Sequence, residues 1–235
     1  MTNTALLNNV EHGNLRVDTR RMIHLGDDVM FALTFPAEFR DLQAHYPIVF
    51  RKTPEGSFQP IALFGFKDGQ NLFLDETRWD AGYLPLSIER QPFLIGVDGD
   101  ELMVYIDLDS PRVGTDLGEV VFLEHGGTSE FLERMNSRLL ALFHGLQSTP
   151  AFVIALLEHD LLESFTLDVE LDDGTRNRLA GFYAINEERL AGLDGPALGR
   201  LSQSGYLQPI YMAIASVSNF RALIERMNQA NAARP

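Results

Sequence analysis

The chain contains no cysteine among its 235 residues. Disulfide bonds, thiolate nucleophiles and cysteine-ligated metal sites are therefore excluded together. Lysine is also scarce, because only Lys52 and Lys67 occur among the 19 basic residues. We expect Lys67 to lie in a hairpin turn, where a solvated amine is a poor nucleophile. Schiff-base and pyridoxal chemistry are thus disfavoured.

The sequence motifs of common catalytic sites are missing as well. There is no Gly-x-Ser-x-Gly elbow, no Ser-x-x-Lys pair and no glycine-rich phosphate loop. No two of the six histidines are three or four residues apart, so a local zinc motif is absent. Asp107 and Asp109 begin like a calcium loop, but Pro111 breaks the required spacing. We predict no metal and no cofactor, and we lean towards a protein that is not an enzyme.

Targeting and membrane signals are weak. Residues 1–9 contain neither a basic stretch nor an apolar run, so a cytoplasmic location is expected. Residues 139–157 and 201–220 carry no charge, and each run is about long enough to cross a bilayer. Polar residues interrupt both runs, together with Pro150 in the first and Pro209 in the second. We therefore predict two helix–turn–helix segments and no membrane-spanning helix.

Negative charge dominates the composition. The net charge of -14 repels phosphate backbones, so we expect no nucleic-acid partner. Residues 94–133 hold ten Asp and Glu, Asp100 among them, against the single Arg112. This stretch could be a docking face for a basic partner. Solvated hairpin turns and an acidic first helical turn explain the same pattern, and we favour that explanation.

Hydrophobic patterning predicts an α+β fold. Strand-like segments separated by turn residues fill much of the region before residue 125. Two hairpins are predicted in that region, residues 58–66 with 71–75 and residues 88–97 with 101–108. Helical spacing prevails after residue 125. Residues 165–171 and 178–185 form the exception, since they alternate around Asp172-Asp173-Gly174-Thr175. We expect an aromatic-rich antiparallel sheet and a helix-dominated C-terminal part that carries one further β-hairpin. Without a linker or a repeat, residues 1–235 are predicted to form a single domain, with a β-rich lobe at about 14–125 and a helical lobe at about 128–230.

Seven aromatic residues crowd the segment 58–93, where they could line a ligand groove. Most of the Phe residues are better explained as the packed face of a sheet. Trp79 and Tyr83 are the least core-like, because they lie in a loop, and Arg90 could hold a carboxylate or a phosphate. We predict a ligand-binding site at five residues: Trp79, Tyr83, Arg90, Gln91 and Asp75.

The same region resembles a known family. The matching segments are Pro47-Ile-Val-Phe50, Ala62-Leu-Phe-Gly65, Asn71-Leu-Phe73, Tyr83-Leu-Pro-Leu86, Arg90-Gln-Pro-Phe93 and Gly181-Phe-Tyr183. In combination they resemble the bacterial SapC family, over residues 45–227. The family is named after a gene cluster for surface-layer protein secretion, so the resemblance implies an accessory role in export or peptide transport. It implies no catalytic residue.

Two functional hypotheses result. In the first, the chain is a non-catalytic, cytoplasmic accessory or peptide-binding protein of an export or uptake system, with a protein or peptide as its partner. In the second, it is an enzyme or a small-molecule-binding partner in a pathway of the flavin-dependent halogenase type, because relatives are often encoded beside such flavoproteins. A structural subunit that docks a basic partner through residues 94–133 is a third option. The sequence makes no prediction of oligomeric state.

Overall fold

The structure, a computed structural model, describes residues 3–75, 78–99 and 101–232. The chain divides into two compact units. Unit 1 comprises residues 1–27, 74–79 and 86–144, and unit 2 comprises residues 28–73, 80–85 and 145–235. Both units contain helices and antiparallel strands, which confirms the predicted α+β class. The single domain with two lobes stays a prediction.

Unit 1 contains two small antiparallel sheets, with strand orders β1-β7-β6 and β8-β2-β9. The predicted hairpin at the acidic turn is confirmed, because Asp98 pairs with Glu101 across it. Gly99 takes the positive φ that this turn requires. The elements of unit 1 are β1 (Thr4–Leu6), β2 (Arg16–Val17), η1 (Ile23–Leu25), α2 (Leu86–Glu89), β6 (Phe93–Asp98), β7 (Glu101–Asp107), β8 (Val113–Gly114), β9 (Glu119–Val120) and the first half of α3 (Glu130–Glu158).

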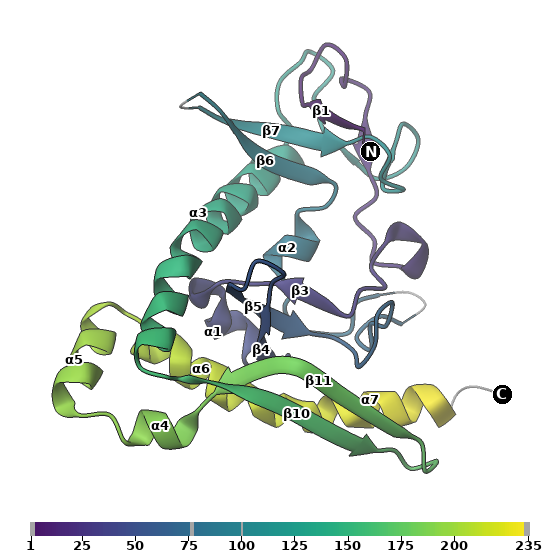
Figure 1. Ribbon diagram of the computed structural model, residues 1–235. Helices are drawn as coiled ribbons and strands as arrows, with labels where there is room; N and C mark the ends of the chain where they lie inside the picture. The colour runs from purple at the N-terminus through teal and green to yellow at the C-terminus, as the bar shows by residue number, and fades with distance from the viewer. Residues whose placement is uncertain (1–2, 76–77, 100, 233–235) are drawn as a thin grey trace. The chain divides into compact units, whose positions relative to one another are not determined.

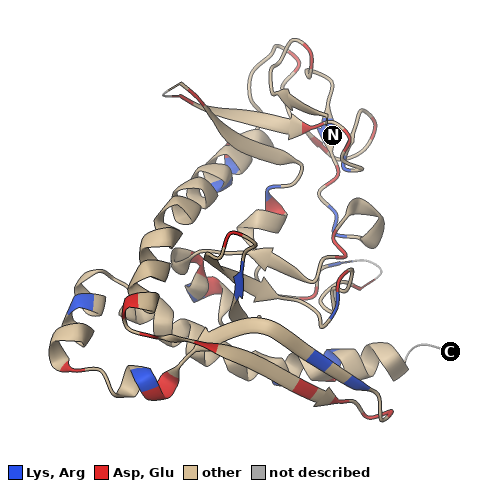
Figure 2. Ribbon diagram, in the orientation of Figure 1, with Lys and Arg blue, Asp and Glu red and all other residues tan. Residues whose placement is uncertain are grey.

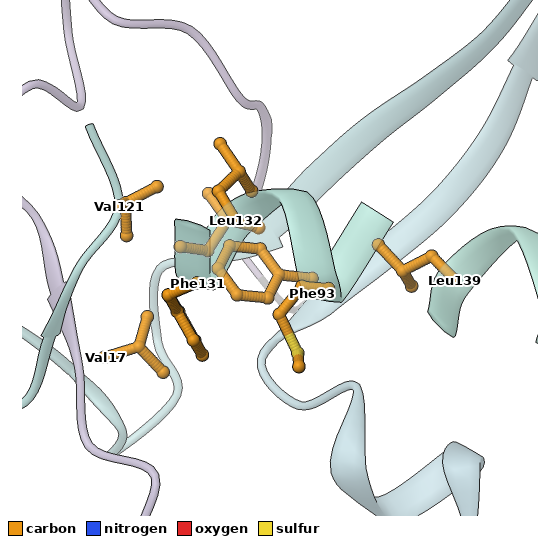
Figure 3. Packing of buried hydrophobic residues seen from close by; sticks show 8 residues of the cluster. Val17, Phe93, Val121, Phe131, Leu132 and Leu139 are labelled. Atoms are coloured by element: carbon orange, nitrogen blue, oxygen red, sulfur yellow. The ribbon is translucent and has the colours of Figure 1, made fainter. Parts of the chain in front are cut away.

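A hydrophobic cluster holds unit 1 together (Figure 3). Helix α3 contributes apolar residues at spacings of three and four, which place them on one face of the helix. Phe131 of this face packs against Phe93 of β6, with ring centroids 5.9 Å apart. The buried members of the cluster are Val17, Phe93, Ile106, Val121, Phe131, Leu132, Met135 and Leu139.

Unit 2 is built on a five-stranded antiparallel sheet of order β10-β11-β4-β5-β3. The predicted C-terminal hairpin is confirmed as β10 and β11, and α6 and α7 run along this ribbon (Figure 1). The elements are β3 (Phe31–Leu33), η2 (Pro36–Glu38), α1 (Phe39–Leu42), β4 (Ile48–Lys52), β5 (Phe58–Leu63), the second half of α3, β10 (Leu162–Glu170), β11 (Arg176–Ile185), α4 (Glu187–Ala191), α5 (Gly195–Gln203), α6 (Leu207–Ser216), η3 (Val217–Asn219) and α7 (Phe220–Ala232).

The C-terminal helices begin and end at residues with capping chemistry. The Asn186 side chain accepts a hydrogen bond from the Arg189 N–H at 2.7 Å and caps α4. Asp194 caps α5 in the same way, through the Ala197 N–H. Gly205 has a positive φ and follows the end of α5. The predicted helix–turn–helix over residues 201–220 is therefore confirmed, and η3 interrupts the helices just before Phe220.

The predicted turn at Thr149-Pro150 is wrong, because α3 is continuous from Glu130 to Glu158. A proline inside a helix removes one backbone hydrogen bond and crowds the preceding turn, so other contacts must compensate. The hydroxyls of Ser148 and Thr149 bond to the Gly145 carbonyl at 2.8 and 2.9 Å, and the fully buried Phe152 anchors the following turn. By length and composition α3 could cross a membrane, as could many core helices, and 39% of its most apolar stretch is buried. The prediction of no membrane-spanning helix stays untested.

Candidate functional site

Most of the aromatic set belongs to the core. Phe64, Phe66 and Phe73 are buried in unit 2, and Phe93 is buried in unit 1. Tyr46 lies between Phe64 and Phe73, with ring centroids 5.2 and 4.7 Å away. Packing therefore accounts for these side chains. Phe58, at the start of β5, is only partly buried.

The predicted site residues are divided between the units. Asp75, Trp79, Arg90 and Gln91 belong to unit 1, whereas Tyr83 belongs to unit 2. Trp79 forms a β-bridge with Leu74. The Arg90 guanidinium donates to the Phe93 carbonyl at 2.6 Å, and burial lowers the pKa of Arg90. Glu76 and Thr77 of the same loop lie outside the described residues. A ligand site at these five residues stays a prediction.

Tyr83 takes part in a buried chain of hydrogen bonds. Its hydroxyl donates to Glu38 Oε1 at 3.0 Å, and the Thr34 hydroxyl donates to Glu38 Oε2 at 2.6 Å. Tyr46 in turn donates to the Tyr83 carbonyl. Glu38 and Thr34 are both buried, so these contacts replace the water that a carboxylate would otherwise require. The sequence analysis missed Glu38, although it is the only charged residue between 29 and 39.

The loop that carries Tyr83 is attached to α7. Arg226 donates to Asp80 Oδ2 at 2.9 Å and to the Asp80 carbonyl at 3.0 Å. The same guanidinium lies over the Phe73 ring, 4.5 Å from its centroid. A charged hydrogen bond fixes the start of this loop at Asp80, and the cation–π contact fixes the Arg226 side chain that makes it.

An apolar groove of about 430 Å³ lies in unit 2, beside the chain of hydrogen bonds that joins Tyr83, Glu38 and Thr34. One wall is formed by β5 and the end of β3, and the other by the second half of α3. Ile154 and Leu157 of α3 are 55% and 46% exposed, and both belong to the helical wall of the groove. The apolar lining residues are Leu33, Phe58, Pro60, Leu146, Pro150, Val153, Ile154 and Leu157.

One end of the groove is polar. Thr34 belongs to its lining and donates to Glu38, so the groove is connected through Glu38 to Tyr83. Gln59 and Thr149 also line it. An apolar surface with a few polar groups is the usual composition of a binding site.

Strand β5 extends beyond the end of its neighbour β3, and the edge of β5 that faces β3 is left unpaired by β3 there. The Thr34 N–H donates to the Pro60 carbonyl at 3.2 Å, so that carbonyl points towards β3. Pro60 has no N–H to donate in return, and β3 ends at Leu33. Because backbone groups alternate along a strand, the N–H and C=O of Phe58 point to this side too, beyond the end of β3. The groove is therefore bordered by backbone that can pair with an extended chain.

Removing the Tyr83 hydroxyl tests the hydrogen-bond chain. Tyr83→Phe is expected to lower the free energy of unfolding by about 1–2 kcal/mol, because the buried Glu38 loses a donor. Urea denaturation followed by circular dichroism measures the change. The matched control is Tyr211→Phe, since Tyr211 is 54% exposed. Equal effects of the two variants would contradict a stabilising role for the hydrogen bond from Tyr83 to the buried Glu38.

Fold and groove together define an α+β protein with a preformed apolar groove. Within the described residues, no three His, Asp or Glu side chains are placed to hold a metal ion. The chain belongs to the SapC family, whose sequence model matches residues 7–223. Comparisons with curated proteins and with solved structures gave no match. The resemblance drawn from the segments between residues 45 and 227 is thus confirmed.

Proposed function

We propose that this SapC-family chain is a non-catalytic accessory protein that binds an extended, apolar peptide segment of a partner protein in the groove of unit 2. The observation that carries the proposal is the groove itself, with its exposed Ile154 and Leu157. The association of the family name with surface-layer secretion supports a role beside a bacterial export or uptake system. In this proposal the protein acts in the cytoplasm.

Strand edge and apolar wall together favour an extended peptide. A peptide beside Phe58 could pair with its N–H and C=O, as in recognition by strand addition. Alternate side chains of such a peptide would point towards Val153, Ile154 and Leu157. Main-chain pairing would supply affinity, and the apolar wall would select hydrophobic side chains.

Binding can be measured with synthetic peptides. The probes are fluorescein-labelled eight-residue peptides in which Leu, Val or Phe alternates with Ser, and the readout is fluorescence anisotropy of the full chain. The double variant Ile154→Asn/Leu157→Asn should weaken binding about tenfold or more, because each half-exposed side chain contributes about 1 kcal/mol when it is covered.

Leu140→Asn provides the matched control. Leu140 lies on the same helix and is 42% exposed, but it does not line the groove. Its substitution should leave peptide affinity unchanged within about twofold. If peptides with Ser at every apolar position bind equally well, or if the double variant binds like the parent chain, the groove is not the peptide site.

The second hypothesis, a small-molecule partner or enzyme, is favoured by the size of the groove. Its volume of about 430 Å³ falls within the range of roughly 300–1,000 Å³ that small-molecule sites occupy. Indole and flavin mononucleotide are suitable probes, and isothermal titration calorimetry measures their binding to the full chain. Binding of either compound that Ile154→Asn abolishes, without binding of the peptides, would favour this hypothesis.

The ligand-binding site predicted from the sequence provides a third set of variants for the peptide-binding experiment. Trp79→Phe and Arg90→Ala change residues of unit 1, whereas the groove belongs to unit 2. We expect both variants to keep peptide affinity within about twofold of the parent chain. A loss of peptide binding in either variant would instead favour the predicted ligand-binding site at Trp79, Tyr83 and Arg90.

A further inference from the structure

A second concave surface lies in unit 1, between the loops at residues 9–16 and 115–126. This loop pocket has a volume of about 790 Å³. The Asn9 side chain donates to the Gly126 carbonyl at 2.7 Å, and Arg16 donates to the Gly118 carbonyl at 3.0 Å. These bonds join the two loops, so the loop pocket is preformed.

The rim of the loop pocket exposes large apolar side chains. Val10 is 88% exposed and Leu123 is 54% exposed, and both line the pocket. Phe122 beside them is partly buried. Exposed apolar residues gathered around a concave surface are typical of a protein interaction site.

Charge determines what kind of partner this surface fits. Among the described residues, two acids line the loop pocket, Glu11 and Glu124, against one cation, Arg16, whose guanidinium is held by the Gly118 carbonyl. The single basic residue of the stretch 94–133, Arg112, has a side chain with 0% exposure and is paired with Asp27 at 2.5 Å. The exposed part of the acidic stretch therefore carries no Lys or Arg side chain, and Figure 2 shows Asp and Glu positions in red along the β6–β7 hairpin and the neighbouring loops of unit 1.

Basic residues elsewhere in the chain do not neutralise the acidic side chains of residues 94–133 either. Among the residues that the structure describes, no Lys, Arg or His forms an ion pair with them. Asp100 lies outside the described residues. The field at the loop pocket is accordingly negative, and it would repel nucleic acid and anionic lipid while attracting a cationic chain.

We propose that the loop pocket docks a basic segment of a partner protein. A Lys or Arg side chain of that segment enters between Glu11 and Glu124, and its apolar neighbours pack against Val10 and Leu123. Unpaired acids accelerate the encounter, and the apolar rim stabilises the docked complex. The surface is separate from the groove of unit 2, so this inference does not depend on the proposed function.

The probe is a fluorescein-labelled eight-residue peptide in which Lys alternates with Leu, titrated with the full chain. Glu11→Gln/Glu124→Gln is expected to weaken binding about tenfold or more, and Val10→Ser/Leu123→Ser several-fold. Raising NaCl from 50 to 200 mM should weaken binding to the parent chain much more than binding to the Gln variant.

Controls separate a docking site from net charge alone. Glu187→Gln/Glu188→Gln removes two exposed charges from α4 of unit 2 and should change affinity less than about twofold. Ile154→Asn/Leu157→Asn should also leave the affinity for the Lys peptide unchanged. This variant therefore distinguishes a failure of the loop-pocket proposal from a failure of the proposed peptide site in unit 2. Equal losses in the two Gln variants, no binding of the Lys peptide, or equal binding of a peptide with Glu in place of Lys would each overturn the proposal.

Discussion

Asp27→Ala is expected to lower the free energy of unfolding by about 3–5 kcal/mol, the largest effect of any single change described. The Asp27 and Arg112 side chains both have 0% exposure, and they are 2.5 Å apart. Asp27 also accepts the Met22 N–H at 2.8 Å. Removal of the carboxylate would leave the Arg112 charge inside unit 1 without its anion.

Arg21 is a second buried cation that depends on the Asp27 carboxylate. Its guanidinium lies 3.4 Å from Asp27 Oδ1, with the side chain 10% exposed. Burial, and then the nearby charge of Arg112, lowers the pKa of Arg21. Asp27 is thus the anion that two buried guanidinium groups share, and its loss would leave both cations facing each other.

Urea denaturation of the parent chain and of Asp27→Ala measures the effect. The control is Asp168→Ala, because Asp168 pairs with Arg178 on the surface, where both side chains are at least 70% exposed. That variant should change stability by less than about 1 kcal/mol. The combined variant Asp27→Leu/Arg112→Met should recover much of the loss, since apolar residues can replace a buried ion pair. Similar losses for Asp27→Ala and Asp168→Ala would contradict the buried-pair account.

Gly145→Ala is expected to destabilise the chain by about 2–3 kcal/mol, although alanine normally stabilises a helix. A Cβ atom at position 145 of α3 would lie 2.2 Å from a ring carbon of Phe35. Phe35 is buried and has little room to move. The glycine is required because α3 approaches this ring closely.

For Gly199 we expect the opposite effect of an alanine substitution on stability. It lies in α5, and no atom would come within 4 Å of an added Cβ. Gly199→Ala should therefore raise the free energy of unfolding by about 0.5–1 kcal/mol. Thermal unfolding of both variants gives the comparison. Stabilisation by Gly145→Ala would show that α3 does not pack against Phe35 as closely as described.

Local sequence signals predicted the hairpins well. Alternation on both sides of a tight turn identifies β6–β7 and β10–β11, because both strands and their turn are adjacent in the sequence. The same reasoning was wrong for residues 58–75. There β5 pairs with β4 and β3 instead of a returning strand at 71–75. Turn chemistry indicates that the chain reverses, but partners distant in sequence decide which strands pair.

Capping residues at Asn186 and Asp194 mark where α4 and α5 begin, whereas Pro150 does not mark a helix boundary. A cap is a local feature, whereas continuation through a proline depends on packing. The buried Phe152 and the hydroxyl contacts to the Gly145 carbonyl favour continuity in α3, and neither is visible in the local pattern.

The candidate groove could not be predicted from spacing. Its walls come from residues 57–60 and 146–157, which are far apart in the chain. Sequence reasoning did select Tyr83, and the structure connects it through Glu38 to Thr34 in the groove. The Phe residues were also interpreted correctly as mostly core. Burial of Glu38 depends on tertiary contacts, so its charge alone gave only a weak signal.

Peptide binding in the groove of unit 2 is tested most directly by nuclear magnetic resonance. The isotope-labelled full chain is titrated with the alternating apolar peptide, and backbone amide and methyl shifts are followed. We predict that the largest shifts occur at the Phe58 amide and at the methyl groups of Val153, Ile154 and Leu157. Shifts confined to the surroundings of Trp79 and Arg90, or no shifts at saturating peptide, would contradict the proposed site.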